Sequence, residues 1–238
     1  MKEASFARKD NGELRLATRE AGEGDTVEFR GFQPVDFELF AIPDFPGRMA
    51  SLREHLKPKL IELGTSLAPR IQEATGVPTF PHVAQHMRRR VNPPERSWVA
   101  FARAKNGYKR WTHYRVSVGL DSVRLSVFVE DDSDDKLPFG AYLTANAATL
   151  LEALGDTPVT WLTLTEERPV PHTEVTAVTL VELGERLQRR KLLKFEAGVV
   201  LTPQEACALA PAAFEDWAMT QVRALSPLYL AGVGSVGQ

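Results

Sequence analysis

Apolar positions recur at three- and four-residue steps after Pro46, which is the spacing of an amphipathic helix. Pro58 and Gly64 interrupt this pattern, so the helix is expected to kink or split there. A further helix is predicted to begin at Pro81, whose fixed φ suits a first helical position. It ends before Asn92-Pro93-Pro94, because a residue that precedes proline avoids the α region. The apolar positions of the first helix are Met49, Leu52, Leu56, Leu60, Leu63, Leu67 and Ile71.

The pattern then changes to alternation with period two, which is typical of β-strands. Asn106-Gly107 predicts a tight hairpin between the first two strands. A capping box, Thr202 to Glu205, opens a last helical region that runs to about Leu230. The predicted strands are Ser97–Arg103, Tyr108–Val118, Val123–Glu130, Val159–Thr165 and Leu192–Val200, and further helices are predicted at Pro138–Leu154 and Thr176–Arg189.

This order of elements predicts an α+β fold, a two-layer domain with a mostly antiparallel sheet and helices packed on one face. Residues 1–32 are polar and punctuated by glycine, so we expect an N-terminal arm or a small hairpin extension. Residues 33–231 are expected to form a single α+β domain. Residues 232–238 are expected to form a flexible, glycine-rich tail.

Composition narrows the class of protein. A chain of 238 residues with 43% hydrophobic residues can bury a core without disulfides, and its single cysteine, Cys207, suits a reducing compartment. The charged N-terminus is unlike a signal peptide, and no apolar run is long enough to span a bilayer. We therefore expect a cytoplasmic protein that has no membrane partner.

Basic residues concentrate between His82 and Arg115. This stretch holds nine basic residues against one acid, Glu95, so its charge is +8 in a chain whose net charge is −2. A segregated positive surface on a neutral protein favours phosphates or another polyanion. The basic residues are Arg88, Arg89, Arg90, Arg96, Arg103, Lys105, Lys109, Arg110 and Arg115.

Helical geometry would place His82, His86 and Arg89 on one stripe, with Arg90 at its edge. On the strand that follows, alternation places His113 and Arg115 on one face, together with Lys109 and Trp111 and opposite to Tyr108. If the helix and the strand are adjacent, imidazoles and guanidiniums converge, and an aromatic ring is available to stack on a base. The predicted ligand-binding residues are His82, His86, Arg89, Arg90, Lys109, Tyr108 and Trp111, and the catalytic candidates are His82, His86 and His113.

These residues predict a module that binds a phosphate-bearing ligand, either a nucleic acid or a nucleotide. One alternative is a phosphoryl- or phosphodiester-processing enzyme in which a histidine is the general acid or base. The other is a structural module whose basic surface meets a protein partner. No cofactor is predicted. The His82-x-x-x-His86 spacing suits zinc, but nearby guanidiniums disfavour a cation, and the acidic segment Glu130–Asp135 is interpreted as a solvated turn.

The segment from Phe80 to Pro94 resembles the signature of the YktB-like family of uncharacterised bacterial proteins. The segments Trp98–Phe101 and Gly107–Lys109 extend the resemblance, which covers roughly residues 33 to 231 and is weaker at Arg115 and residues 131–135. It implies an α+β two-layer domain with an antiparallel sheet, loosely similar to biotin-ligase and class II synthetase topology. That analogy implies a ligand cleft on the sheet and assigns no catalytic residue.

Overall fold

A computed structural model describes residues 28–86, 91–165 and 168–234 of the chain. Within these residues the strands form one antiparallel seven-stranded sheet in the order β1-β2-β3-β4-β7-β5-β6. The predicted α+β class is confirmed. The strands are β1 (Phe80–Val83), β2 (Arg96–Ala102), β3 (His113–Gly119), β4 (Val123–Val129), β5 (Thr160–Trp161), β6 (Val170–Pro171) and β7 (Phe195–Leu201).

The helices follow the predicted pattern in most places. The predicted break falls at a π-helical turn, Leu52–Leu56, just before Pro58, whereas α3 continues through Gly64. Thr202 caps α6 and exchanges hydrogen bonds with Glu205, as the capping box predicts. The helices are α1 (Pro34–Glu38), α2 (Phe45–Ser51), α3 (Lys57–Thr75), α4 (Lys136–Leu154), α5 (Ala177–Arg189), α6 (Pro203–Ala208), α7 (Pro211–Ala224) and α8 (Ser226–Gly234), with 3₁₀ turns at Leu39–Ala41, Tyr108–Arg110 and His172–Glu174.

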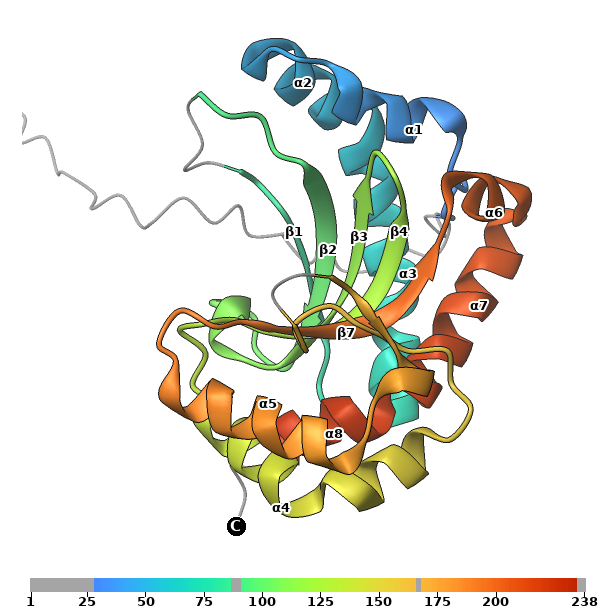
Figure 1. Cartoon of the computed structure of the whole chain (residues 1–238). Helices are drawn as coiled ribbons and strands as arrows, with labels where there is room; N and C mark the ends of the chain where they lie inside the picture. The colour runs from blue at the N-terminus through green and yellow to red at the C-terminus, as the bar shows by residue number, and fades with distance from the viewer. Residues whose placement is uncertain (1–27, 87–90, 166–167, 235–238) are drawn as a thin grey trace, which may run out of the picture.

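One face of the sheet is apolar and is covered by helices. Figure 1 shows α3 and α7 along one side of β1 to β4, and α4, α5 and α8 gathered below the strands. Tyr114 of β3 stacks on Tyr229 of α8 and donates a hydrogen bond to the Val222 carbonyl of α7. Phe195 of β7 contacts Phe139 of α4 edge-on at 4.7 Å. The hydrophobic core therefore lies between this face and the helices.

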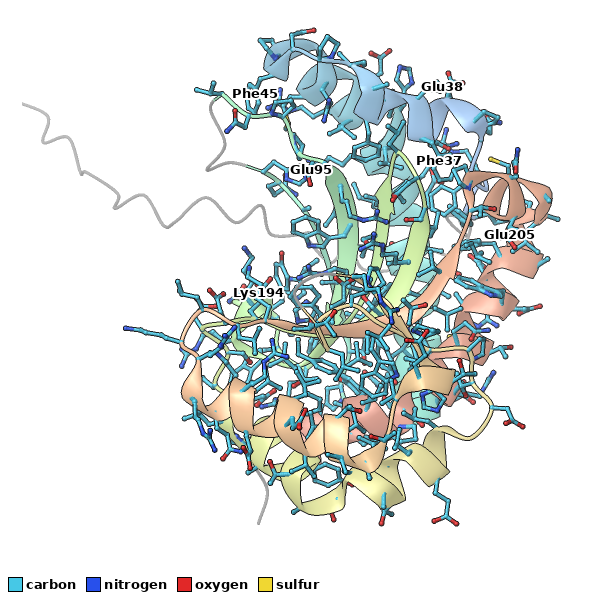
Figure 2. All side chains as sticks on the ribbon, viewed as in Figure 1. Phe37, Glu38, Phe45, Glu95, Lys194 and Glu205 are labelled. Carbon is cyan, nitrogen blue, oxygen red and sulfur yellow. The ribbon has the colours of Figure 1, made fainter. Side chains whose placement is uncertain are left out.

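The alternate strand positions point to the opposite face, which we call the polar face. The register places these side chains in rows, because residues paired across antiparallel strands point to the same side. The residues of the polar face used below are Arg96, Trp98, His113, Arg115, Ser117, Arg124, Ser126, Phe128, Glu130, Lys194 and Glu196, and Figure 2 shows Lys194 where the chain enters β7.

The predicted helix from Pro81 is wrong. Residues Phe80–Val83 form edge strand β1, which pairs with Val99–Ala102 of β2. Proline is compatible with an edge strand, where a missing N–H leaves no ladder bond unmade on the outer side. The next described residues, 84–86, are not helical, and residues 87–90 lie outside the described part of the chain.

The predicted strand Tyr108–Val118 is wrong in its first part. Residues Tyr108–Arg110 form a 3₁₀ turn, and the strand begins at His113. Gly107 has a left-handed backbone (φ 64°), but it opens this turn and does not close a tight hairpin. The ten residues between β2 and β3 therefore form a loop that brings Tyr108 onto the polar face.

The structure describes residues at both ends of the predicted domain. Phe29 and Phe32, which lie within the predicted arm, are buried and pack against Phe214 of α7. The predicted tail is wrong for residues 232–234, which belong to α8, and Gly232 lies tightly against Thr112. Residues 235–238 and 1–27 lie outside the described residues, so the division into arm, domain and tail otherwise stays a prediction.

Candidate functional site

The basic segment is paired with carboxylates of the same chain. Four of its arginines form ion pairs with acids that follow them in the sequence by 15 to 32 residues. The acidic segment Glu130–Asp135 therefore takes part in the fold, and its interpretation as a solvated turn is wrong for Glu130 and Asp135, which are buried. The pairs, with their shortest N–O distances, are Arg96–Asp121 (3.0 Å), Arg103–Asp135 (2.7 Å), Arg110–Asp134 (2.6 Å) and Arg115–Glu130 (2.9 Å).

Arg115 lies at the centre of the polar face. The residue is 7% exposed, and its guanidinium carbon lies 3.6 Å from the ring centre of Phe128 and 4.7 Å from that of Trp98. Its Nη2 donates to Glu130 and to His113. Its Nε is buried and has no partner among the described residues. The guanidinium is thus held in one position while one donor is left unused.

His113 is held as a neutral ring. Its Nδ1 lies 2.8 Å from the carbonyl oxygen of Trp111 and donates to it, so Nε2 accepts the bond from Arg115. Complete burial, together with the charge of Arg115, lowers the pKa of His113 to about 3. Because both ring nitrogens are occupied and the ring stays neutral near pH 7, His113 positions Arg115 and is a poor general base.

Glu130 joins two cations. Its carboxylate accepts from Arg115 at 2.9 Å and from Lys194 at 2.8 Å, and its side chain is 5% exposed. Burial alone would raise the pKa of Glu130, but Arg115 and Lys194 more than offset this and hold the pKa below its usual value. The Lys194 side chain is 50% exposed, so solvent and ligands can reach this ammonium group.

Aromatic rings line the β1 and β2 side of Arg115. His82 stacks on Tyr108, Tyr108 meets His113 edge-on, and Trp98 donates from Nε1 to the Tyr108 hydroxyl at 3.1 Å. His82 also donates from Nε2 to the Ala104 carbonyl. Register explains this meeting, since His82 faces Ala100, and Ala100 faces Arg115. We call the set His82, Trp98, Tyr108, His113, Arg115, Phe128, Glu130 and Lys194 the Arg115 cluster.

The other predicted site residues lie apart from this cluster or at its margin. His86 has a left-handed backbone (φ 51°) and touches Trp98 edge-on, while its Nε2 lies 3.2 Å from the Ser97 hydroxyl. Lys109 is exposed on the 3₁₀ turn. Trp111 packs under the guanidinium of Arg103 at 4.3 Å. The predicted residues Arg89 and Arg90 lie outside the described residues.

Metal binding has no support in the described part of the chain. No group of three or more His, Cys, Asp or Glu residues suited to a metal ion occurs within residues 28–86, 91–165 and 168–234. His82 lies on β1 and His86 beyond its end, so the helical spacing assumed for a zinc pair is absent.

None of the helices described is long and apolar enough to cross a membrane.

Two hollows lie elsewhere on the molecule. One of about 240 Å³ is bounded by residues before β6 and by α5, including Arg168 and Arg186, and one of about 360 Å³ lies at Arg190–Leu193. Neither is lined by a residue of the Arg115 cluster. The candidate site is therefore a patch of side chains on the polar face, and we base it on fixed charges and unused donors.

Sequence comparison identifies the family of this chain. The family described as "Domain of unknown function (DUF1054)" matches residues 32–229. The chain belongs to the DUF1054 family. A "UPF0637 protein" of Bacillus cytotoxicus is 30% identical over 210 residues, which cover 83% of this chain and 95% of the relative. A second, from Bacillus velezensis, is 32% identical over 198 residues, covering 83% and 94%.

A shorter match has a higher sequence identity. A "UPF0637 protein" of Staphylococcus aureus is 38% identical over 105 residues, covering 44% of this chain and 52% of the relative. These matches confirm the predicted membership in the YktB-like family of bacterial proteins.

Several residues of the site were missed by the sequence analysis. Glu130 was placed in a solvated turn, and Lys194 and Phe128 were not singled out. One local signal was present: the motif Arg-x-Ser occurs at 115–117 and again at 124–126, on strands predicted to be consecutive. In a strand of period two such residues share one face, so polar side chains at these positions indicate a polar face.

Proposed function

We propose that this DUF1054 protein binds a small ligand carrying an oxyanion, a phosphate group first and a carboxylate second, at the Arg115 cluster. The observation that carries the proposal is the fixed guanidinium of Arg115 with its unused Nε donor. Buried donors are nearly always paired in folded proteins, so an unpaired one supports the idea of an acceptor supplied from outside. Lys194, the residue before β7, adds an accessible cation, and lysine is a common phosphate ligand.

The internal ion pairs favour a small ligand over a nucleic acid. Four arginines of the basic segment are already paired with carboxylates, and such pairs reduce the number of counterions that a polyanion would displace. His113, one of the three catalytic candidates, is a poor acid or base because its buried ring is neutral and hydrogen-bonded at both nitrogens. We therefore propose binding without assigning a reaction, and a cytoplasmic location remains part of the proposal.

Removal of the accessible cation tests this function. Lys194→Gln is expected to weaken the binding of inorganic phosphate about tenfold, because it removes the charge nearest to solvent while Arg115 keeps Glu130 as its partner. Isothermal titration calorimetry with phosphate, and with acetate as the carboxylate probe, measures the change in Kd. Acetate that binds more tightly than phosphate would reverse the order of the two oxyanions.

Lys191→Gln serves as the matched control, since Lys191 is exposed, lies three residues away and carries the same charge. Its Kd for phosphate should equal that of the wild type. Equal weakening in both variants would reduce the effect to net charge, and absence of binding of either anion to the wild type at millimolar concentration would disprove the proposed function.

A further inference from the structure

Two arginines and two serines form a square on the polar face, next to the Arg115 cluster. Register pairs Arg115 of β3 with Ser126 of β4, and Ser117 of β3 with Arg124 of β4. The Cβ atoms of such directly opposed residues lie about 5 Å apart, and those of diagonal residues about 7 Å apart. We call Arg115, Ser117, Arg124 and Ser126 the Arg/Ser square. Its two guanidiniums thus start from positions that one small molecule can bridge.

Both arginines of the square have an unused buried donor. The Nε atoms of Arg115 and Arg124 are buried without a hydrogen-bond partner in the described part of the chain. Arg96, on the same face, differs from them. Its Nε and both Nη atoms donate to Ser117, Asp121 and Ser122. The unused donors are therefore confined to two diagonal positions and are not a general property of arginines on this face.

Arg124 also lacks a carboxylate. Arg96 pairs with Asp121 and Arg115 with Glu130, but Arg124 makes no ion pair among the described residues. The charge of Arg124 acts on Arg96. Burial, and after it the charge of Arg124, lowers the pKa of Arg96 to about 10. Arg124 is partly exposed and makes no ion pair among the described residues, so an incoming anion meets its charge, which also acts on the Asp121 carboxylate.

The serines complete the set of donors. The Ser117 hydroxyl is buried, accepts a bond from Arg96 Nε and donates to none of the described residues, so its proton lacks an acceptor among them. The Ser126 hydroxyl donates to Glu196 at 3.0 Å, which holds that carboxylate on the β7 side of the square. Around Arg124 the unused groups are donors, as recognition of a second anionic group requires.

We propose that Arg124 and Ser117 form a second anion subsite beside the Arg115 cluster, so that the ligand of this protein carries two anionic groups. The inference rests on the proposed function, since the first group is the oxyanion bound by Arg115 and Lys194. It goes further by naming the ligand class: compounds with two linked phosphate or carboxylate groups bind better than compounds with one.

Pyrophosphate and phosphate distinguish two anionic groups from one. The wild type is expected to bind pyrophosphate at least tenfold more tightly than phosphate in titration calorimetry. In Arg124→Gln this advantage should fall below about threefold, while the Kd for phosphate changes little, because the first subsite is intact. Malonate compared with acetate applies the same test to carboxylates.

Arg223→Gln is the matched control, because Arg223 is an exposed arginine at the end of α7, on the helix-covered side. It should keep the full preference for pyrophosphate. Equal affinity of the wild type for one and two anionic groups would overturn the second subsite and leave the first standing. Equal weakening of phosphate and pyrophosphate in Arg124→Gln would overturn it as well, by showing a general effect, and a thermal melt checks that the variant is folded.

Discussion

Acidification from pH 6.5 to pH 5 is expected to lower the free energy of unfolding by about 2 kcal/mol through His113 alone. The unfolded chain binds a proton at this histidine below its ordinary pKa of 6.5, whereas the folded protein does so only near pH 3. The stabilisation is therefore complete above pH 6.5 and is lost as the pH falls towards 3. A difference of 3.5 pKa units corresponds to roughly 5 kcal/mol in total.

Denaturant unfolding between pH 7 and pH 5 measures this loss. The window excludes most carboxylates, although Glu130, whose pKa is also lowered, adds a further loss below about pH 4.5 in the same direction. The groups whose charges act on the ring are Arg115, Glu130 and His82. The free energy of unfolding is expected to fall with pH in this window because protonation would place a charge on a buried imidazole beside a guanidinium.

His113→Phe isolates the contribution. The variant keeps an aromatic ring between Phe128 and Tyr108, and it should be less stable at pH 7 but flatter in its pH profile by about 2 kcal/mol across the window. The control is His55→Gln, at a side chain that is 47% exposed, which should keep the wild-type profile. A His113→Phe variant with the wild-type slope would show that another group takes up the proton.

Local patterns predicted most helices and strands because the residues that form each pattern lie close together in the sequence. The helical spacing after Pro46 and the capping box at Thr202 depend on residues within a few positions of each other, and both were found in the structure. The alternation at Ser97–Arg103 likewise marks β2 to within a residue. The helix predicted from Pro81 failed because its evidence, one proline and a short apolar pattern, is equally compatible with an edge strand.

The candidate site was harder to predict because it depends on pairing across strands. His113 and Arg115 were correctly placed on one face, but Tyr108 was placed on the wrong one, since a 3₁₀ turn shifts the alternation before β3. Lys194 reaches Glu130 across 64 residues of sequence. Only the register of β4 against β7 brings these two together, and no local pattern encodes it.

Linear charge counting misjudged the basic segment for the same reason. The sum of +8 treats each arginine as exposed, whereas the fold places four of them against acids from the following turns. Two of these acids are neighbours in the sequence, Asp134 and Asp135. They differ strongly in burial, so they offer a direct test of how much of the pairing is structural.

Asp135→Asn is expected to lower the free energy of unfolding by about 3–5 kcal/mol, whereas Asp134→Asn should cost less than about 1 kcal/mol. The Asp135 side chain is 0% exposed and accepts from both Nη atoms of Arg103 and from the backbone N–H of Thr112. Loss of its charge leaves the partly buried Arg103 without this counterion. The Arg110–Asp134 pair is exposed on both sides, so water replaces it.

Urea unfolding of the two variants at pH 7 measures both costs in one protein and one loop. The double variant Arg103→Gln/Asp135→Asn should lose less free energy of unfolding than Arg103→Gln and Asp135→Asn lose together. In the double variant neither partner remains as an unpaired charge. Similar costs for Asp134→Asn and Asp135→Asn would contradict the buried pairing. The basic segment would then regain a charge available to a polyanion, and the preference for a small ligand at Arg115 would lose its main support.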